Sequence, residues 1–340
     1  MRFRNRVFIV CALAILAALA SVPAYATFPG KNGRIAFVQA GEIFSMKPDG
    51  SDVKQLTHVG PDRAASWPAW SADGKQIVFN RGTPPPDGDA TGEIWLMNSD
   101  GSNQHLLLAE QNFKEQRPSF SPDGTKVIFA RCNLNLGEGD SCGIFTIGTD
   151  GHQLKTIVPI RLGDTDRSPM YSPDGQTIAF IISPDEHGGF NGVTYLVNSD
   201  GSNRHRITPP GPCLIRPDWS PDGARITLFA HLCNPQNETI AVMNANGTHI
   251  RYLTNNGADF FNAPHDRNPA FSPDGNFIVF ERNSPDYSSS TIYIMRSDGS
   301  ELKAIAQLAR ATKSAKPKSQ GKLHKIEEGG NTPRWGVASE

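Results

Sequence analysis

The chain has 340 residues, a formal net charge of −1 and 38% hydrophobic residues. A charge this close to balance gives no reason to expect nucleic acid or an anionic membrane as the main partner. The length exceeds that of an average domain, but closed all-β rings commonly reach this size. We therefore expect one large domain and no nucleic-acid partner.

The first 26 residues have the pattern of a secretory signal peptide. Three arginines precede an unbroken apolar run over residues 7–20, and residues 24–26 (Ala-Tyr-Ala) form a small-residue cleavage site. The run is too short to span a membrane, and no later segment is apolar for long enough. The alternative is an uncleaved N-terminal anchor. We expect a mature, monomeric chain of residues 27–340 that is periplasmic or extracellular.

A proline followed two residues later by an aromatic recurs along the whole mature chain. The six pairs are Pro68–Trp70, Pro118–Phe120, Pro169–Tyr171, Pro217–Trp219, Pro269–Phe271 and Pro333–Trp335. Each of the first five leads into a turn of the Ser-Pro-Asp-Gly type and then a short apolar strand. In such turns proline presets φ, aspartate bonds its own backbone and glycine accepts left-handed angles. Each copy therefore predicts a β-hairpin.

A second signature alternates with the first. It is an alternating apolar strand, an Asp-Gly or Asn-Gly turn, and a final strand. The turn glycines are Gly50, Gly101, Gly151, Gly201, Gly247 and Gly299. The residue four positions before each glycine is Met, Ile or Val, and the residue six positions before is mostly aromatic. Positions two apart share one face of a strand, so we interpret these columns as packing between repeats.

Four strands in a unit of about 50 residues, repeated six times, are typical of a β-propeller. The sixth proline, Pro333, has no strand after it, and the missing strand is at the other end of the chain, in residues 33–37. We predict an all-β, six-bladed propeller of four-stranded antiparallel blades. A C-terminal strand over residues 331–335 completes blade 1 beside residues 34–38. A linear repeat array would instead need polar capping repeats.

These signatures resemble the TolB-like propeller repeats of bacterial cell-envelope proteins, which are related to WD-type blades. The resemblance covers residues 30–337. The family's namesake carries an α/β domain ahead of its propeller, whereas here blade 1 begins a few residues after the expected cleavage site. The resemblance therefore implies the propeller but not roles that depend on that domain. The same repeats form the non-catalytic propeller of dipeptidyl-peptidase-like hydrolases.

Four cysteines follow the signal segment, and each pair brackets one hairpin or loop. Antiparallel pairing would bring Cys132 close to Cys142, and Cys213 close to Cys233. An oxidising compartment favours disulfides, so we predict both bridges. The alternative is four free buried thiols. Metal binding is disfavoured because no further ligand stands at the required spacing.

Both tight turns of each blade fall at one end of the ring, so the longer loops gather at the opposite face, where binding concentrates. Charged residues flank these loops and the channel mouth. The candidate binding residues are Arg81, Arg117, Arg131, Arg167, Arg216, Asp218, His231, His265, Arg267, Arg282 and Arg334. This set could hold an anionic group, such as a carboxylate at a peptide terminus. Alternatively, the arginines pair with Asp166, Asp218 and Asp266 and tie neighbouring blades together.

Residues 309–330 form an insertion rich in basic residues, with little apolar content. A flexible basic loop could steer an acidic partner or a surface polysaccharide, or it could simply be solvated.

The main hypothesis is an exported, non-enzymatic propeller that binds a protein or peptide of the cell envelope through its loop-rich face. We expect no cofactor and no metal. No Gly-x-Ser-x-Gly elbow occurs in the sequence. One alternative is a glycan lyase or metal-assisted enzyme with a site at the channel mouth, because His231 and His265 both lie in loops of that face. The other is an accessory propeller for a separately encoded peptidase.

Overall fold

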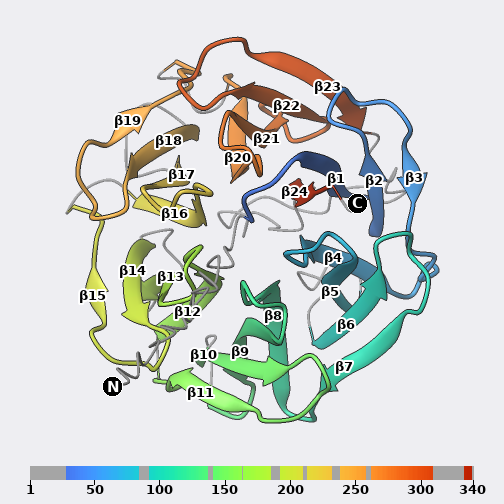
Figure 1. Cartoon of the computed structure of the whole chain (residues 1–340), viewed down its shortest axis with the longest axis vertical. Helices are drawn as coiled ribbons and strands as arrows, with labels where there is room; N and C mark the ends of the chain where they lie inside the picture. Colours follow the sequence, from blue (N-terminus) through green and yellow to red (C-terminus); the bar gives the residue numbers. More distant parts are fainter. Residues whose placement is uncertain are drawn as a thin grey trace, which may run out of the picture.

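The computed structural model describes residues 28–83, 92–136, 141–162, 164–184, 192–209, 213–231, 238–257, 262–308 and 333–338. Within these ranges the chain forms antiparallel blades arranged around a common axis (Figure 1). The six-bladed, all-β architecture predicted from the repeats is confirmed. The described ranges hold no helix that is long and apolar enough to cross a membrane.

Each of the first three blades has four strands, which follow one another from the axis outward. Blade 1 consists of β24 (Arg334–Val337), β1 (Asn32–Gln39), β2 (Glu42–Met46) and β3 (Lys54–Gln55). Blade 2 consists of β4 (Ala64–Trp70), β5 (Gln76–Gly82), β6 (Glu93–Asn98) and β7 (His105–Ala109). Blade 3 consists of β8 (Phe113–Phe120), β9 (Lys126–Asn133), β10 (Ser141–Gly148) and β11 (Lys155–Val158).

The other three blades follow the same plan. Blade 4 consists of β12 (Asp164–Tyr171), β13 (Thr177–Pro184), β14 (Val193–Asn198) and β15 (His205–Arg206). Blade 5 consists of β16 (Cys213–Trp219), β17 (Arg225–His231), β18 (Thr239–Asn244) and β19 (Arg251–Tyr252). Blade 6 consists of β20 (His265–Phe271), β21 (Phe277–Asn283), β22 (Ser290–Arg296) and β23 (Lys303–Leu308).

The two ends of the described chain meet in blade 1. Strand β24 pairs antiparallel with β1, with Ile35 opposite Trp335 and Ala36 opposite Arg334. The Trp335 ring also packs against Phe277 of blade 6, with 6.3 Å between ring centroids. The predicted closing strand is confirmed, and it removes the exposed sheet edges that an open ring would leave.

Aromatic stacking recurs inside the blades and involves the aromatic position six residues before each turn glycine. Phe37 stacks on Phe44 in blade 1, and Phe280 stacks on Tyr293 in blade 6. The methionine column is also buried, with Met46 and Met97 at most 1% exposed. These columns form the apolar core, as expected.

The disulfide prediction is confirmed for Cys132 and Cys142, which lie opposite each other on β9 and β10 and are bonded. Cys213 is also disulfide-bonded. Its predicted partner, Cys233, lies outside the described residues, as does the basic insertion over residues 309–330.

Five inner strands share an irregularity at the residue before the repeated proline. Register shifts interrupt β4, β8, β12, β16 and β20 at this point. Proline has no N–H to donate to the ladder, so pairing breaks there. The residue before it has a positive φ of 52–57° in all five strands; these residues are Trp67, Arg117, Ser168, Arg216 and Asn268. Few residues other than glycine adopt such angles, so the fold must hold these five in place.

Candidate functional site

The inner strands surround a narrow cavity with a volume of about 20 Å³, enough for one or two water molecules. Its walls come from β4, β8, β12, β16 and β24, one strand from each of blades 1 to 5. The lining residues are Trp67, Pro68, Ala69, Arg117, Pro118, Ser119, Ser168, Pro169, Met170, Arg216 and Arg334. Four of the five left-handed residues are therefore in the lining. The register shift at each repeated proline, with its left-handed preceding residue, is the local feature that directs a side chain into the channel.

Two arginines and one tryptophan form the centre of this cavity. The guanidinium carbons of Arg117 and Arg216 each lie 4.5 Å from the centroid of the Trp67 ring, within the range of cation–π attraction. Arg117 Nη1 donates to Ser168 Oγ at 2.8 Å, and Arg216 Nη1 donates to Asn268 Oδ1 at 2.6 Å. Both hydrogen bonds join residues in the same left-handed position of neighbouring blades. They fix the two guanidinium planes.

A second small cavity, of about 40 Å³, adjoins the first and shares Arg334. Arg334 Nη1 donates to Asp218 Oδ1 at 3.2 Å, and Asp218 Oδ2 accepts from the backbone N–H of Phe271 at 2.8 Å. Burial lowers the pKa of Arg334, the Asp218 carboxylate opposes this effect, and the positive charge of Arg117 adds to it. This end of the channel is lined by aromatic rings, including Trp70 and Trp335.

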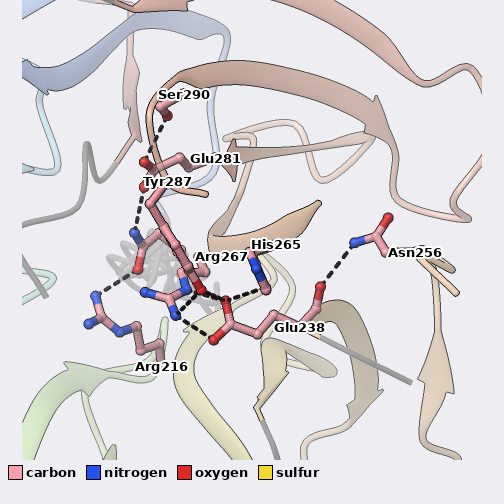
Figure 2. A network of polar contacts seen from close by, with 9 residues as sticks. Arg216, Glu238, Asn256, His265, Arg267, Glu281, Tyr287 and Ser290 are labelled. Atoms are coloured by element: carbon pink, nitrogen blue, oxygen red, sulfur yellow. Dashed lines mark hydrogen bonds and ion pairs between the residues drawn. The ribbon is translucent and has the colours of Figure 1, made fainter. Parts of the chain in front are cut away.

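A polar chain leads from the channel into blade 6 (Figure 2). Asn268, which accepts from Arg216, donates through Nδ2 to Glu281 Oε2 at 3.0 Å. The other carboxylate oxygen, Oε1, accepts from Ser290 Oγ at 2.8 Å. Glu281 is fully buried. Arg216 is thus linked through the Asn268 amide to the buried carboxyl group of Glu281.

A second network joins blades 5 and 6, also shown in Figure 2. Arg267 donates to both carboxylate oxygens of Glu238 and, through Nη2, to Tyr287 Oη at 3.0 Å. The ring of His265 stacks on Tyr287 with 4.5 Å between centroids, and its Nδ1 lies 3.5 Å from Glu238 Oε2. Burial alone would lower the pKa of Arg267, but Glu238 raises it above its usual value. This network locks one blade to the next.

Tyr287 reaches this network from an unusual turn. Residues 284–287 read Ser-Pro-Asp-Tyr, a copy of the repeated turn with tyrosine in the glycine position, and Tyr287 has a φ of 54°. Ser284 and Asp286 make the same turn hydrogen bonds as their counterparts elsewhere. A left-handed tyrosine is strained, and its contacts with Glu238 and His265 hold it there.

The structure brings together only some of the residues predicted to form one binding mouth. Arg117, Arg216, Asp218 and Arg334 line the two cavities of the channel. Arg267 and His265 belong instead to the network between blades 5 and 6. Arg167 lies on β12 and is half-buried. The side chain of His231 lies outside the described part of the structure.

Three further candidates form separate contacts. The Arg81 guanidinium stacks on Trp95, with 4.6 Å to the ring centroid. Arg131 lies over the Phe113 ring and pairs with Glu110. Arg282 donates to both oxygens of Asp266, at 2.6 and 2.8 Å, within blade 6. The alternative interpretation expected arginine pairs with Asp218 and Asp266 that tie neighbouring blades together. Both pairs are present, but Arg282 and Asp266 lie in the same blade, and Arg334 and Asp218 join blades 1 and 5 across the channel. The side chain of Asp166 is not described.

The sequence-based prediction did not include Trp67, Ser168 and Asn268, because it was limited to charged side chains. The available signal was position, since each of the three directly precedes a repeated proline. Glu238 was missed because its partners, Arg267 and Tyr287, lie in the next blade. Glu281 was missed although its partners, Asn268 and Ser290, lie on the two adjacent strands of its own blade. Among the described residues, no group of three or more His, Cys, Asp or Glu side chains is placed to hold a metal ion.

Comparison with known proteins gives a consistent family assignment. A family model described as the TolB beta propeller domain matches residues 132–318. The chain is 26% identical over 232 residues to the Tol-Pal system protein TolB of Francisella tularensis, which covers 67% of this chain and 48% of that protein. It is 24% identical over 219 residues to an uncharacterized peptidase, YuxL, of Bacillus subtilis, which covers 52% of this chain and 31% of that protein. The chain thus spans half or less of the length of these relatives.

A solved structure agrees with the architecture. The crystal structure of TolB from Acinetobacter baumannii superimposes with a TM-score of 0.63 over 90% of this chain and 67% of that chain. The two sequences are 20% identical, so this likeness concerns the fold alone.

Proposed function

This chain belongs to the TolB β-propeller domain family, and from that premise we propose that it is an exported, non-enzymatic binding protein of the cell envelope. Its loop-rich face and channel hold a partner protein or peptide. The relatives named as Tol-Pal system proteins support a place in an envelope assembly. The signal-like first 26 residues support export.

The observation that carries the binding role is the lining of the channel cavity. Arg117, Arg216 and Arg334 present guanidinium donors there, beside the aromatic face of Trp67. Arginine and tryptophan are the side chains that most often dominate the binding energy of protein interfaces. They are held by rigid inner strands, which reduces the entropy lost when a partner docks. The channel therefore has the character of a binding site.

A second role is favoured by the similarity to YuxL. The chain matches less than a third of that peptidase. The corresponding proposal is an accessory propeller that pairs with a separately encoded peptidase. Crosslinking capture, described next, tests both roles, because the identity of the captured partner distinguishes an envelope protein from a hydrolase.

The test is crosslinking capture from the native envelope with three forms of the mature protein. These are the wild type, the double variant Arg117→Ala/Arg216→Ala, and the control Arg251→Ala. Arg251 lies on outer strand β19, away from the channel, and donates to Asp298 O at 2.7 Å. We expect one set of partners that the wild type and the control retain and the channel variant loses. An identical set from all three forms would refute a binding role for the channel.

A further inference from the structure

We propose that the channel cavity binds the C-terminal carboxylate of a partner chain, between Arg117, Arg216 and Arg334 and against Trp67. This inference rests on the proposed function and names the chemical group that the site recognises.

The charge of the lining favours an anion. The residues around the cavity include three guanidinium groups and no carboxylate; one of the three, Arg334, pairs with Asp218 in the adjoining cavity. A narrow channel with low-dielectric walls focuses the field of such groups and concentrates ions of opposite charge. The planar fork of an arginine matches the two oxygens of a carboxylate. Ser168 and Asn268 already orient two of the three forks through neutral oxygens, at 2.8 and 2.6 Å.

Trp67 supplies a second, independent observation. Its side chain is 95% buried in the cavity wall, since only 5% of its surface is exposed. Its indole N–H finds no acceptor in the part of the chain that the structure describes. A buried donor without an acceptor lowers stability, because it has lost its hydrogen bond to water. An oxygen atom bound in the cavity would satisfy this donor.

Backbone strain points to the same place. Trp67, Arg117, Ser168 and Arg216 line the cavity with φ between 52° and 57°, which is unfavourable for side chains of these types. Such strain persists where the surrounding fold over-determines it, and it gathers at ligand-binding sites. Here the left-handed backbone places the side chain of one residue from each of four blades in the lining of the channel.

The dimensions select a chain end over an internal acidic residue. Inner strands of five blades enclose the cavity sideways, so a ligand enters along the axis. The volume of about 20 Å³ holds a group the size of a carboxylate and little more. An internal aspartate or glutamate would require the peptide to enter and double back in the same space. A C-terminus enters end-on.

The test uses mature protein with ¹⁵N-labelled tryptophan, which gives one indole N–H resonance for each of the five tryptophans. The Trp67 resonance is assigned from Trp67→Phe. Four probes are titrated: Ac-Ala-Ala-Ala with a free C-terminus, its C-terminal amide, the internal-acid peptide Ac-Ala-Glu-Ala-NH₂, and sodium acetate. We expect the free acid to shift the Trp67 resonance and the amide to leave it in place. We expect Arg216→Ala to weaken binding of the free acid on the order of tenfold, with Arg251→Ala unchanged.

Each other outcome overturns the inference. Equal shifts from the free acid and the amide would mean that the carboxylate is not recognised, and no shift from either would mean that the cavity does not bind it. An equal response to the internal-acid peptide would assign the site to side-chain carboxylates, and acetate binding as tightly as the tripeptide would assign it to free small anions. If the channel variant loses its captured partners while the tripeptide never shifts Trp67, the proposed function stands and the carboxylate inference fails.

Discussion

A buried carboxylate in blade 3 shows how one residue can set the pH dependence of this fold. Glu115 on β8 is fully buried, and its nearest cation is Arg131, with 3.6 Å between Oε1 and Nε. Burial raises the pKa of Glu115 to about 7, Arg131 opposes this effect, and Glu110 adds to it. The pKa of Glu115 in the folded protein lies above the unfolded value of 4.5, so protonation of Glu115 favours the folded state. This contribution to the free energy of unfolding is fully present below pH 4.5 and is lost as the pH rises toward 7.

The substitution Glu115→Gln is therefore expected to flatten the pH profile. The wild type should lose about 1–3 kcal/mol of unfolding free energy between pH 5 and pH 8 that the variant retains. Urea unfolding at several pH values measures this difference. The control is Glu301→Gln, which removes an exposed carboxylate paired with Arg296 and should leave the slope unchanged. A wild type and a Gln variant with parallel profiles would contradict the assignment.

At the scale of elements, the Asp-Gly turns join each blade to the outer strand of its neighbour. A Cβ added at Gly50, in the turn after β2, would lie 2.0 Å from Ile305 O on β23. Gly50 also has a φ of 87°. This contact links blade 1 to blade 6 at the point where the ring closes.

Gly50→Ala should therefore destabilise the propeller more than an equivalent change in a free turn. The matched control is Gly124→Ala, which has a φ of 69° but nothing within 4 Å of the added Cβ. The control should lose about 1 kcal/mol from the strained angle, and Gly50→Ala at least about 2 kcal/mol more because the strand must move. Thermal and denaturant unfolding measure both variants. Equal losses would show that the turn does not pack against β23.

The repeats and the closing strand could be predicted from the sequence because each depends on local chemistry. Apolar alternation and turn residues recur at fixed spacing, so the blade count and the role of Trp335 follow from the sequence alone. Arg117 and Arg216 were among the candidates for the channel mouth, and both line the channel cavity. Trp67 was not among them, because only charged residues were selected and its position before a repeated proline was not used.

The remaining part of the site depends on contacts between blades. Glu238 lies just before β18, whereas Arg267 and Tyr287 lie in blade 6, 29 and 49 residues further along the chain. No local pattern encodes which of several arginines a buried carboxylate meets. Tyr287 is harder still, because its turn lacks the glycine that marks the other copies. Such pairings are set by how neighbouring blades pack.

At the scale of the whole molecule, the channel exists only because the ring is closed. The cavity takes walls from five blades, and Arg334 on β24 comes from the far end of the chain. A ligand that binds this closed form also stabilises it.

The most direct test of this account is site-specific photo-crosslinking in cells that express the protein. A photoreactive amino acid replaces Ser119 in the channel lining in one variant, and Thr125, directly after the Ser-Pro-Asp-Gly turn that follows β8, in the other. The account predicts a crosslinked partner from position 119 and none from position 125. A partner that crosslinks from the turn and not from the channel would contradict it.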